Sequence, residues 1–424
     1  MIAVLFICLI IFLILGVPVA LSLGLASAIA IWWDGGIPLI TLVQREFSSI
    51  DSFPLMAIPF FILAGVLMEH GGISKRLINF ANAMTGHITG GIGLVVVISS
   101  MLFAAISGSG AATVAALGSI LIPGMINRGY HRNYAGAVQA VSGELGVIIP
   151  PSIPMILYGI STETSISDMF IAGIIPGLMI SLTLAITVYV IAKRRGYPSE
   201  KRATWPERFK AFKEAILALL MPVIILGGIY GGIFTPTEAA VVAVAYAFIV
   251  GVFVYKEIKI KDILTILSNS TITTTVIMFI IANAGLFGWI LSREGVPKMV
   301  AAFFTDISGN AIVFLLCINL LLLIVGMIFD ASAAIIILAP ILAPVAMEFG
   351  IDPVHFGIIM IVNLAMGMCT PPVGVNLFIS CEIAKIKLED ITKAILPFII
   401  VLLVDLMIIS FIPQLSLWLP QFLK

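Results

Sequence analysis

The chain has 424 residues, of which 61% are hydrophobic and 10% are charged, and its 22 lysines and arginines balance 22 aspartates and glutamates. Soluble domains carry about 25% charged and about 45–50% apolar residues, so this composition excludes a soluble globular protein and indicates an all-α polytopic membrane protein. A zero net charge without a basic arm also gives no electrostatic basis for binding nucleic acid.

Apolar runs near the 20 residues that cross a bilayer predict nine membrane spans. The first run lacks a cationic leader and a clear cleavage site, so we interpret it as a membrane helix and not as a removed signal peptide. The spans are expected near residues 2–33, 54–69, 134–160, 169–192, 215–234, 238–255, 263–292, 355–381 and 394–419.

Two further apolar stretches, 91–127 and 311–347, are long enough for two passes but are broken in the middle. The breaks are Ser107-Gly108-Ser109-Gly110 and Asp330-Ala331-Ser332. Irregular backbone at membrane depth is tolerated only where it is buried in protein or lines a cavity. Each stretch is therefore predicted to be a re-entrant hairpin of two half-helices.

An internal repeat appears when the sequence is shifted by 221 residues. Glycine and proline fix backbone breaks, so their coincidence at one offset indicates a duplicated unit. The same shift places Ser109 on Asp330. The aligned pairs are Pro123 with Pro344, Gly136 with Gly357, Gly146 with Gly367, Pro150-Pro151 with Pro371-Pro372, and Pro176 with Pro397.

Charge placement predicts that the two copies are inverted. Lys75, Arg76, Arg128 and Arg132 flank the first hairpin, whereas no lysine or arginine occurs between residues 299 and 384. By the positive-inside rule, the first hairpin opens to the cytoplasm and the second to the opposite side. The same reasoning predicts a cytoplasmic N-terminus and an external C-terminus.

Three short amphipathic stretches remain, at 73–84, 205–213 and 297–306. The first and third each precede a hairpin and are interpreted as interfacial arm helices; ordinary interfacial loops are the alternative. The predicted organisation is therefore scaffold helices 1–69 and 214–292, arm helices 70–90 and 293–310, a cytoplasmic amphipathic linker 193–213, and transport-domain halves 91–192 and 311–424, which contain the broken helices 134–160 and 355–381.

Inverted repeats with broken helices are typical of secondary transporters, which bind substrate and ions where the breaks meet. Freed carbonyls can bind Na⁺, and half-helix N-termini favour anions. The break at 107–110 is expected to face residues 146–152, and the break at 330–332 to face 367–374, with one Na⁺-type site at each pair. The alternative is that glycine and proline only permit close packing and kinks.

The polar residues near these breaks leave several roles open. Thr113 either caps the second half of its hairpin or joins the site. Asp330 is a cation ligand or an N-cap, and Glu144 is equally compatible with a functional and a structural role. Glu238 fits a capping box, and Asp405 has no assigned role.

The cysteines and histidines give no pattern of a disulfide framework, a resident metal or a cofactor. No arginine lies in either hairpin, so the nearest cations to a cavity are Arg45 and His70. An anionic substrate would then be held by half-helix N-termini and hydroxyls, with Na⁺ neutralising charge nearby.

Several runs resemble one known family, the large membrane subunit of tripartite ATP-independent periplasmic (TRAP) transporters. The similarity covers nearly the whole chain. It is carried by Phe-Pro-Leu-Met-Ala-Ile-Pro-Phe-Phe-Ile-Leu-Ala-Gly at 53–65, Gly-Gly-Ile-Ser-Lys-Arg at 71–76, Ser-Gly-Ser at 107–109, Ile-Ile-Pro-Pro-Ser at 148–152, Gly-Ile-Phe-Thr-Pro-Thr-Glu-Ala-Ala at 232–240 and Thr-Pro-Pro-Val-Gly at 370–374.

The resemblance implies Na⁺-driven elevator import of a carboxylate such as a C4-dicarboxylate or sialic acid across the bacterial inner membrane. It implies a periplasmic solute-binding protein and a small four-span membrane subunit as partners. No additional spans precede residue 1, so the small subunit is expected to be a separate polypeptide. Carried over by motif, the first sodium site is Ser107, Ser109, Gly146 and Pro150, and the second is Asp330, Ser332, Gly367 and Thr370. The expected substrate contacts are Ser152, Thr113, Val373, Gly374 and Arg45.

The sequence leaves three alternative functions: a carrier, an enzyme and a channel. A self-sufficient Na⁺/dicarboxylate carrier would transport without a binding protein. An intramembrane enzyme would need clustered acid, base or metal-binding residues at one depth, and the histidines are scattered. A channel has no need for two hairpins of opposite entry, although the sequence does not exclude it.

Overall fold

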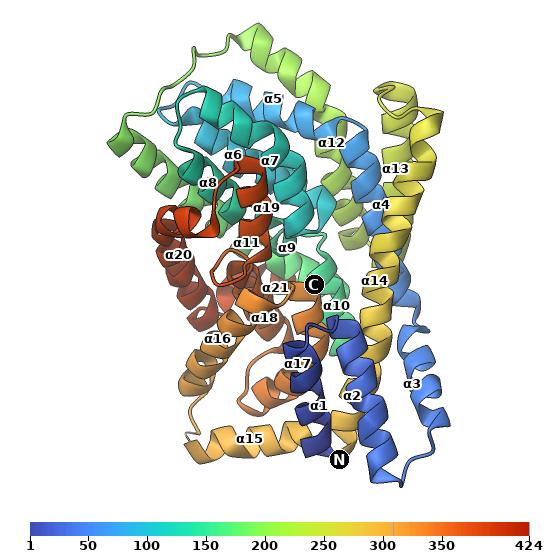
Figure 1. Cartoon of the computed structure of the whole chain (residues 1–424). Coiled ribbons are helices and arrows are strands. Elements are labelled where there is room, and N and C mark those ends of the chain that lie inside the picture. The colour runs from blue at the N-terminus through green and yellow to red at the C-terminus, as the bar shows by residue number, and fades with distance from the viewer. Residues whose placement is uncertain (308, 424) are drawn as a thin grey trace.

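The computed structural model describes residues 1–307 and 309–423. Within those residues the chain forms helices joined by turns and loops, with no β-strand (Figure 1). Nine described helices are long and apolar enough to cross a membrane, and one bent pair, Arg132–Ile148 with Ile153–Ser161, raises the number to ten. The prediction of an all-α polytopic membrane protein is confirmed.

The N-terminal run 2–33 is two helices and not the single span expected from the sequence. Helices α1 (Ile2–Ile14) and α2 (Val19–Asp34) pack against each other. Gly16, with φ of +75°, and Pro18, directly before α2, end the first helix and turn the chain. Both residues were visible in the sequence, but the uniform hydropathy of the run concealed the turn.

The N-terminus lies at the same end of the molecule as α15 (Val296–Ile307) and at the opposite end from α5 (Ile73–Thr85), which carries Lys75 and Arg76 (Figure 1). The sequence predicted the N-terminus and α5 on the same, cytoplasmic side, and the structure places them at opposite ends because the chain turns between α1 and α2. If the α5 end is cytoplasmic, as the positive-inside rule predicts, the N-terminus lies on the other side; which end faces the cytoplasm stays a prediction.

The segments expected to form the scaffold pack on the long helix α14. This helix contacts α2, α3 and α4, while α13 packs along α4 and α12 contacts both α13 and α5. The elements are α3 (Ile40–Ile50), the 3₁₀ helix η1 (Phe53–Met56), α4 (Ala57–His70), α12 (Trp205–Tyr230), α13 (Pro236–Ile249), the π-helix η2 (Val250–Val254) and α14 (Ile260–Arg293).

Each half of the expected transport domain contains a pair of hairpin helices and a broken helix. In the first half the break covers residues 149–152, and in the second it covers residues 368–374. The elements are α6 (Gly91–Ser107), α7 (Gly110–Asn127), α8 (Arg132–Gly143), α9 (Leu145–Ile148) and α10 (Ile153–Ser161), then α16 (Ala311–Ile328), α17 (Ala331–Glu348), α18 (Pro353–Gly367) and α19 (Val375–Ala384).

Three further helices complete the fold. Helix α11 (Ile166–Arg195) packs against α6 and α20 (Leu388–Phe411), and the terminal helix α21 (Gln414–Leu423) lies on α11. The last span therefore ends at Phe411 and not at residue 419. The amphipathic stretch 205–213 is the beginning of α12, continuous with the span that follows it.

The broken helix of each half lies against the other half. Helix α8 contacts α19 and α20, and α10 contacts α17 and α18. The two halves therefore form one packed unit, and their breaks lie inside it. The division into a moving unit and a scaffold, and the entry of each hairpin from one membrane face, stay predictions.

Candidate functional site

The tip of the first hairpin is closed by three hydroxyl side chains. Ser109 is the N-cap of α7, and its Oγ accepts a hydrogen bond from the Ala112 N–H at 3.4 Å. The Thr113 hydroxyl donates to the Ser109 carbonyl at 2.8 Å and lies 2.9 Å from the Ser107 hydroxyl. Thr113 therefore does not cap α7, because Ser109 does. Its hydroxyl lies within the hairpin tip, and its part in an ion or substrate site stays a prediction.

This tip lies directly against the first break. The Ile153 N–H donates to the Gly108 carbonyl at 3.3 Å, which joins tip and break through the backbone. A methyl group on Gly146 would lie 2.6 Å from the Thr113 Oγ1 atom, so only glycine permits this approach. Ser152 is buried, and its hydroxyl donates to the Val147 carbonyl at 2.6 Å. The break also contains Pro150, whose peptide bond to Pro151 is cis.

The second tip has the same relation to the second break. Asp330 is the N-cap of α17, and its Oδ1 accepts a hydrogen bond from the Ser332 N–H at 2.9 Å. A methyl on Gly326 would lie 3.0 Å from the Leu364 Cα and 3.2 Å from the Gly367 Cα. The two backbones are therefore in close contact.

The loop of the second break is fastened to this hairpin. The Gly374 N–H donates to the Met327 carbonyl at 3.0 Å. Thr370 is buried, and its hydroxyl donates to the Met366 carbonyl at 2.8 Å, within its own turn. Val373 lies next to Gly374 in the loop and is partly buried. These contacts join Gly326 and Met327, at the end of α16, to Gly367 and Gly374; that Asp330 and Ser332 face residues 367–374 stays a prediction.

A cavity of about 370 Å³ brings the two tips together, within the roughly 300–1,000 Å³ range of small-molecule sites. Helices α4 and α14 form its other wall. Its polar lining consists of backbone and side chains of Ser107–Gly110, Asp330, Ser332, Glu69 and Thr273. None of the lining residues, which all fall in the described part of the chain, is a lysine, arginine or histidine.

Glu69 and Thr273 are cavity residues that the sequence did not reveal. Glu69 lies at the end of an apolar run, where a charged residue is ordinary, and Thr273 lies in a long helix with several threonines. Only the packing of α4 and α14 around the hairpin tips brings them together. The internal repeat at an offset of 221 residues does not identify them, because its aligned pairs all lie in the two transport-domain halves and not in α4 or α14.

Several predicted site residues lie behind the tips and do not line this cavity. Gly146, Pro150, Gly367 and Thr370 belong to the breaks, as do Ser152, Val373 and Gly374, and Thr113 lies inside the first tip. Arg45 is elsewhere: its guanidinium stacks on the Trp289 ring at 4.7 Å from the centroid. His70 is exposed at the end of α4, and its Nδ1 lies 3.0 Å from the Val66 carbonyl.

The remaining carboxylates have distinct environments. Glu238 forms the expected capping box, in which its Oε2 accepts a hydrogen bond from the Thr235 N–H at 2.8 Å. Asp405, for which the sequence gave no role, is buried and accepts a hydrogen bond from the Thr183 hydroxyl. Glu144 is also buried, but neither of its carboxylate oxygens has a hydrogen-bond partner within residues 1–307 and 309–423.

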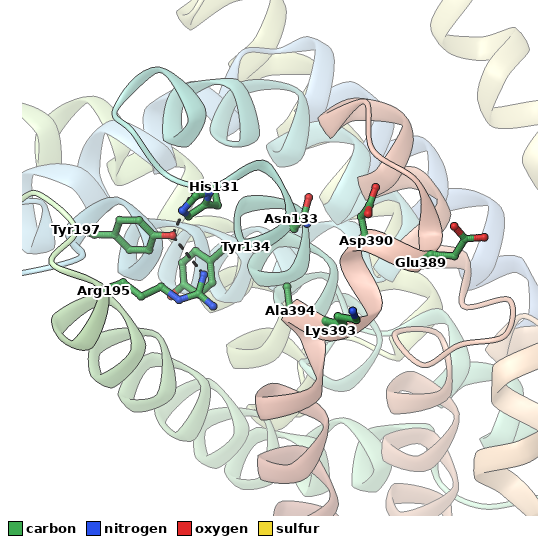
Figure 2. Close-up of a pocket in the computed structure, with 9 residues that line it drawn as sticks. All are labelled: His131, Asn133, Tyr134, Arg195, Tyr197, Glu389, Asp390, Lys393 and Ala394. Carbon is green, nitrogen blue, oxygen red and sulfur yellow. Dashed lines mark hydrogen bonds between the residues drawn. The ribbon is translucent and has the colours of Figure 1, made fainter.

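A larger hollow, about 700 Å³, opens among α8, α11 and α20. In Figure 2 the His131 backbone N–H and the Arg195 guanidinium donate to the Tyr197 hydroxyl on one side, each at 3.5 Å, and Glu389, Asp390 and Lys393 lie on the other. Nearby, burial and the adjacent Tyr197 raise the pKa of Tyr130 to about 12, so its phenol stays protonated. The charged side chains here are exposed and of both signs, and no tip residue lines the hollow, so we assign the site to the smaller cavity.

Comparison with protein families gives one match over nearly the whole chain. The family model described as "Tripartite ATP-independent periplasmic transporter, DctM component" matches residues 6–415.

Curated relatives have corresponding names. The C4-dicarboxylate TRAP transporter large permease protein DctM of Rhodobacter capsulatus is 42% identical over 422 residues, with 96% of each chain covered. The sialic acid TRAP transporter large permease protein SiaM of Vibrio cholerae is 41% identical over 406 residues, covering 96% of this chain and 95% of that protein. The isethionate TRAP transporter permease protein DctMQ of Oleidesulfovibrio alaskensis is 46% identical over 408 residues, covering 96% of this chain but 64% of that protein.

Among solved structures, the Alcanivorax borkumensis YdaH transporter matches with a TM-score of 0.64 at 18% identity, covering 90% of this chain and 88% of that one. This likeness concerns the fold alone. It agrees with the all-helical membrane fold described above.

Proposed function

This chain belongs to the DctM component family of tripartite ATP-independent periplasmic transporters, and on that premise we propose that it imports a carboxylate-bearing solute in symport with Na⁺. Its relatives are named large permeases for C4-dicarboxylates and for sialic acid. A small organic acid of this class is therefore the proposed cargo. The proposed location is the bacterial inner membrane.

The charge of the cavity is the observation that carries Na⁺ coupling. Glu69 and Asp330 are carboxylates, and the lining supplies no cationic side chain to offset them. An anionic solute entering alone would be repelled by both. Na⁺ ions bound behind the tips would offset this repulsion, because each ion cancels one negative charge near the solute. In this view Na⁺ must bind before the solute does.

Two helix N-termini at the cavity also favour a bound anion. Ser109 and Asp330 are the N-caps of α7 and α17, and both line the cavity. A helix N-terminus carries roughly half a positive charge and free N–H groups. We propose that these two ends and the hydroxyls of Ser107 and Ser332 hold the solute's carboxylate, with Na⁺ bound behind them at the breaks.

The proposed ion sites follow the contacts between tips and breaks. Ser107, Ser109, Gly146 and Pro150 would hold the first Na⁺. Asp330, Ser332, Gly367 and Thr370 would hold the second. Na⁺ prefers oxygen ligands, which these segments supply as hydroxyls, a carboxylate and carbonyls freed by glycine and proline.

The position of the cavity supports an elevator movement. One wall belongs to α4 and α14, and the other to both hairpin tips. If the packed unit of the two halves slides along the scaffold, the tips carry the solute past a fixed wall. Arg45 lies on α3 and stacks on Trp289 of α14, so it would stay with the scaffold. Because it does not line the cavity, we do not include it among the proposed substrate contacts.

The proposed partners are a small four-span membrane subunit and a periplasmic solute-binding protein. The chain covers 64% of the relative named DctMQ, which leaves room there for a second component joined to the one matched here. The binding protein is proposed from the family description, which names a tripartite periplasmic system.

Uptake into proteoliposomes tests the proposal. The chain and its small subunit would be reconstituted and offered radiolabelled succinate or sialic acid, with and without an inward Na⁺ gradient and the cognate periplasmic protein. Uptake that requires both is the expected result. Uptake with Na⁺ but without the periplasmic protein would favour a self-sufficient carrier, and uptake indifferent to Na⁺ would contradict the coupling.

A further inference from the structure

Glu144 is a buried charged residue of the packed unit that the proposed function does not explain. It lies at the C-terminal end of α8, where the helix breaks, and only 1% of its surface is exposed. Both carboxylate oxygens lack a hydrogen-bond partner in the described structure. An ionised carboxylate so placed costs several kcal/mol unless a positive charge accompanies it.

A second unpaired buried oxygen belongs to Asn376 on the other half of the molecule, whose amide reaches the turn of α8 that precedes Glu144. Asn376, on α19, is fully buried, and its Oδ1 has no partner among residues 1–307 and 309–423. Its Nδ2 donates to the Ala140 carbonyl at 3.4 Å, and the Cys369 thiol donates to the same oxygen at 3.1 Å. Ala140 precedes Glu144 by four residues and thus shares its face of α8.

The backbone adds further oxygens at the same place. A methyl on Gly110, at the start of α7, would lie 3.1 Å from the Gly143 carbonyl oxygen and 3.3 Å from the Asn376 Nδ2. A methyl on Gly143 would lie 3.3 Å from the Gly110 carbonyl oxygen. Two glycines therefore bring two carbonyls and an amide together immediately before Glu144.

From this arrangement we propose that the Glu144 carboxylate and the Asn376 Oδ1 bind a third Na⁺, with neighbouring backbone carbonyls completing its shell. The ligands are all oxygens, as a hard alkali cation prefers, and the charge of Glu144 balances one monovalent ion. The site joins α8 of the first half to α19 of the second, one residue from the Gly110–Gly143 contact at the first tip.

The inference rests on the proposed Na⁺ coupling but involves different residues. The first two sites join each hairpin to the break of its own half. This third site joins the two halves to each other, so its ion would stabilise the packed unit and favour the closed first tip.

Binding of ²²Na⁺ to the purified chain with its small subunit tests the site. Glu144→Gln keeps the shape of the side chain and removes its charge, and it should lose one bound Na⁺ per chain. Asn376→Ala removes the other side-chain oxygen and should also lose one bound Na⁺ per chain. This second variant tests the site even if Glu144→Gln does not fold. Asn283→Ala is the matched control for Asn376→Ala, since it removes a buried amide on α14 whose Nδ2 has its own partner, the Phe279 carbonyl, and it should bind as many ions as the unmodified protein.

The outcomes separate this inference from the proposed function. If Glu144→Gln and Asn376→Ala bind the full number of ions while Ser109→Ala binds fewer, Na⁺ coupling stands and the third site is refuted. That result would mean that Glu144 carries a proton. If the unmodified protein binds no Na⁺, both proposals fail together.

Discussion

Replacing Gly367 with alanine should force the second hairpin away from the broken helix on which it packs. The added methyl would lie 2.5 Å from the Gly326 Cα and 2.8 Å from the Met327 N. These are backbone atoms, so no side-chain rotation can make room. Met327 also accepts the Gly374 N–H at 3.0 Å, so a displaced α16 strains the loop of the second break as well.

The size of the effect follows from the overpacking. Inserting a methyl into a packed interior costs about 1–3 kcal/mol. If that cost falls on the ion-loaded arrangement of the second site, the affinity for Na⁺ drops by about 5- to 150-fold. Na⁺ activation of solute uptake in proteoliposomes, at saturating solute and periplasmic protein, gives the half-activating concentration directly.

A matched glycine provides the control. Gly227 lies inside α12, and no described heavy atom beyond its own turn lies within 4 Å of an added methyl. Gly227→Ala should therefore leave Na⁺ activation unchanged, and the better helix propensity of alanine should not weaken folding. A Gly367→Ala protein with the half-activating concentration of the parent would refute the claim that the Gly326–Gly367 contact shapes the second site.

Three further substitutions have defined outcomes. Asp330→Asn should raise the half-activating Na⁺ concentration at least tenfold because it removes the only charge of the second site; unchanged activation would remove Asp330 from that site. Arg45→Ala should keep the parental solute half-saturation while losing the stacking on Trp289, and a raised half-saturation in the same uptake assay would return Arg45 to the substrate path. Glu238→Ala should lower the thermal unfolding temperature, because the Thr235 N–H loses the carboxylate that accepts its hydrogen bond in the capping box; intrinsic fluorescence on heating measures this, while Na⁺ activation stays parental.

The sequence predicted well those features that act through the backbone of one segment. Glycine and proline determine where a membrane helix can break, and the structure has breaks at residues 149–152 and 368–374, within the segments predicted to be broken. The capping box at Thr235 was readable for the same reason, since its spacing alone identifies it. Composition was sufficient for the class of protein, because lipid is the only solvent that such a chain can face.

Features that depend on tertiary packing were not readable. The cavity wall formed by Glu69 and Thr273 arises from the crossing of α4 and α14, which no local pattern specifies. The sequence predicts Arg45 as a substrate contact because no arginine lies in either hairpin, yet its partner is Trp289, more than two hundred residues later. The turn between α1 and α2 is a different case: its signals, Gly16 and Pro18, are local but lie within a run judged by hydropathy alone.

The two halves resemble each other in backbone but not in the position of charge, and this difference bears on how ions would bind. Asp330 caps the second hairpin, where the offset of 221 puts the neutral Ser109 in the first. Glu144 ends α8 in the first half, where the same offset puts Ala365 in the second.

Each half thus contributes one carboxylate near its break. In the second half it is Asp330, at a tip that faces the cavity; in the first half it is Glu144, which is buried. A Na⁺ at Asp330 would act on the solute directly, through the charge of the cavity. A Na⁺ at Glu144 would act on the packing of the first tip instead. Neutralising Asp330 should then weaken the dependence of solute affinity on Na⁺, whereas neutralising Glu144 should weaken cooperativity among the ions. Equal effects of the two substitutions on both quantities would contradict this division.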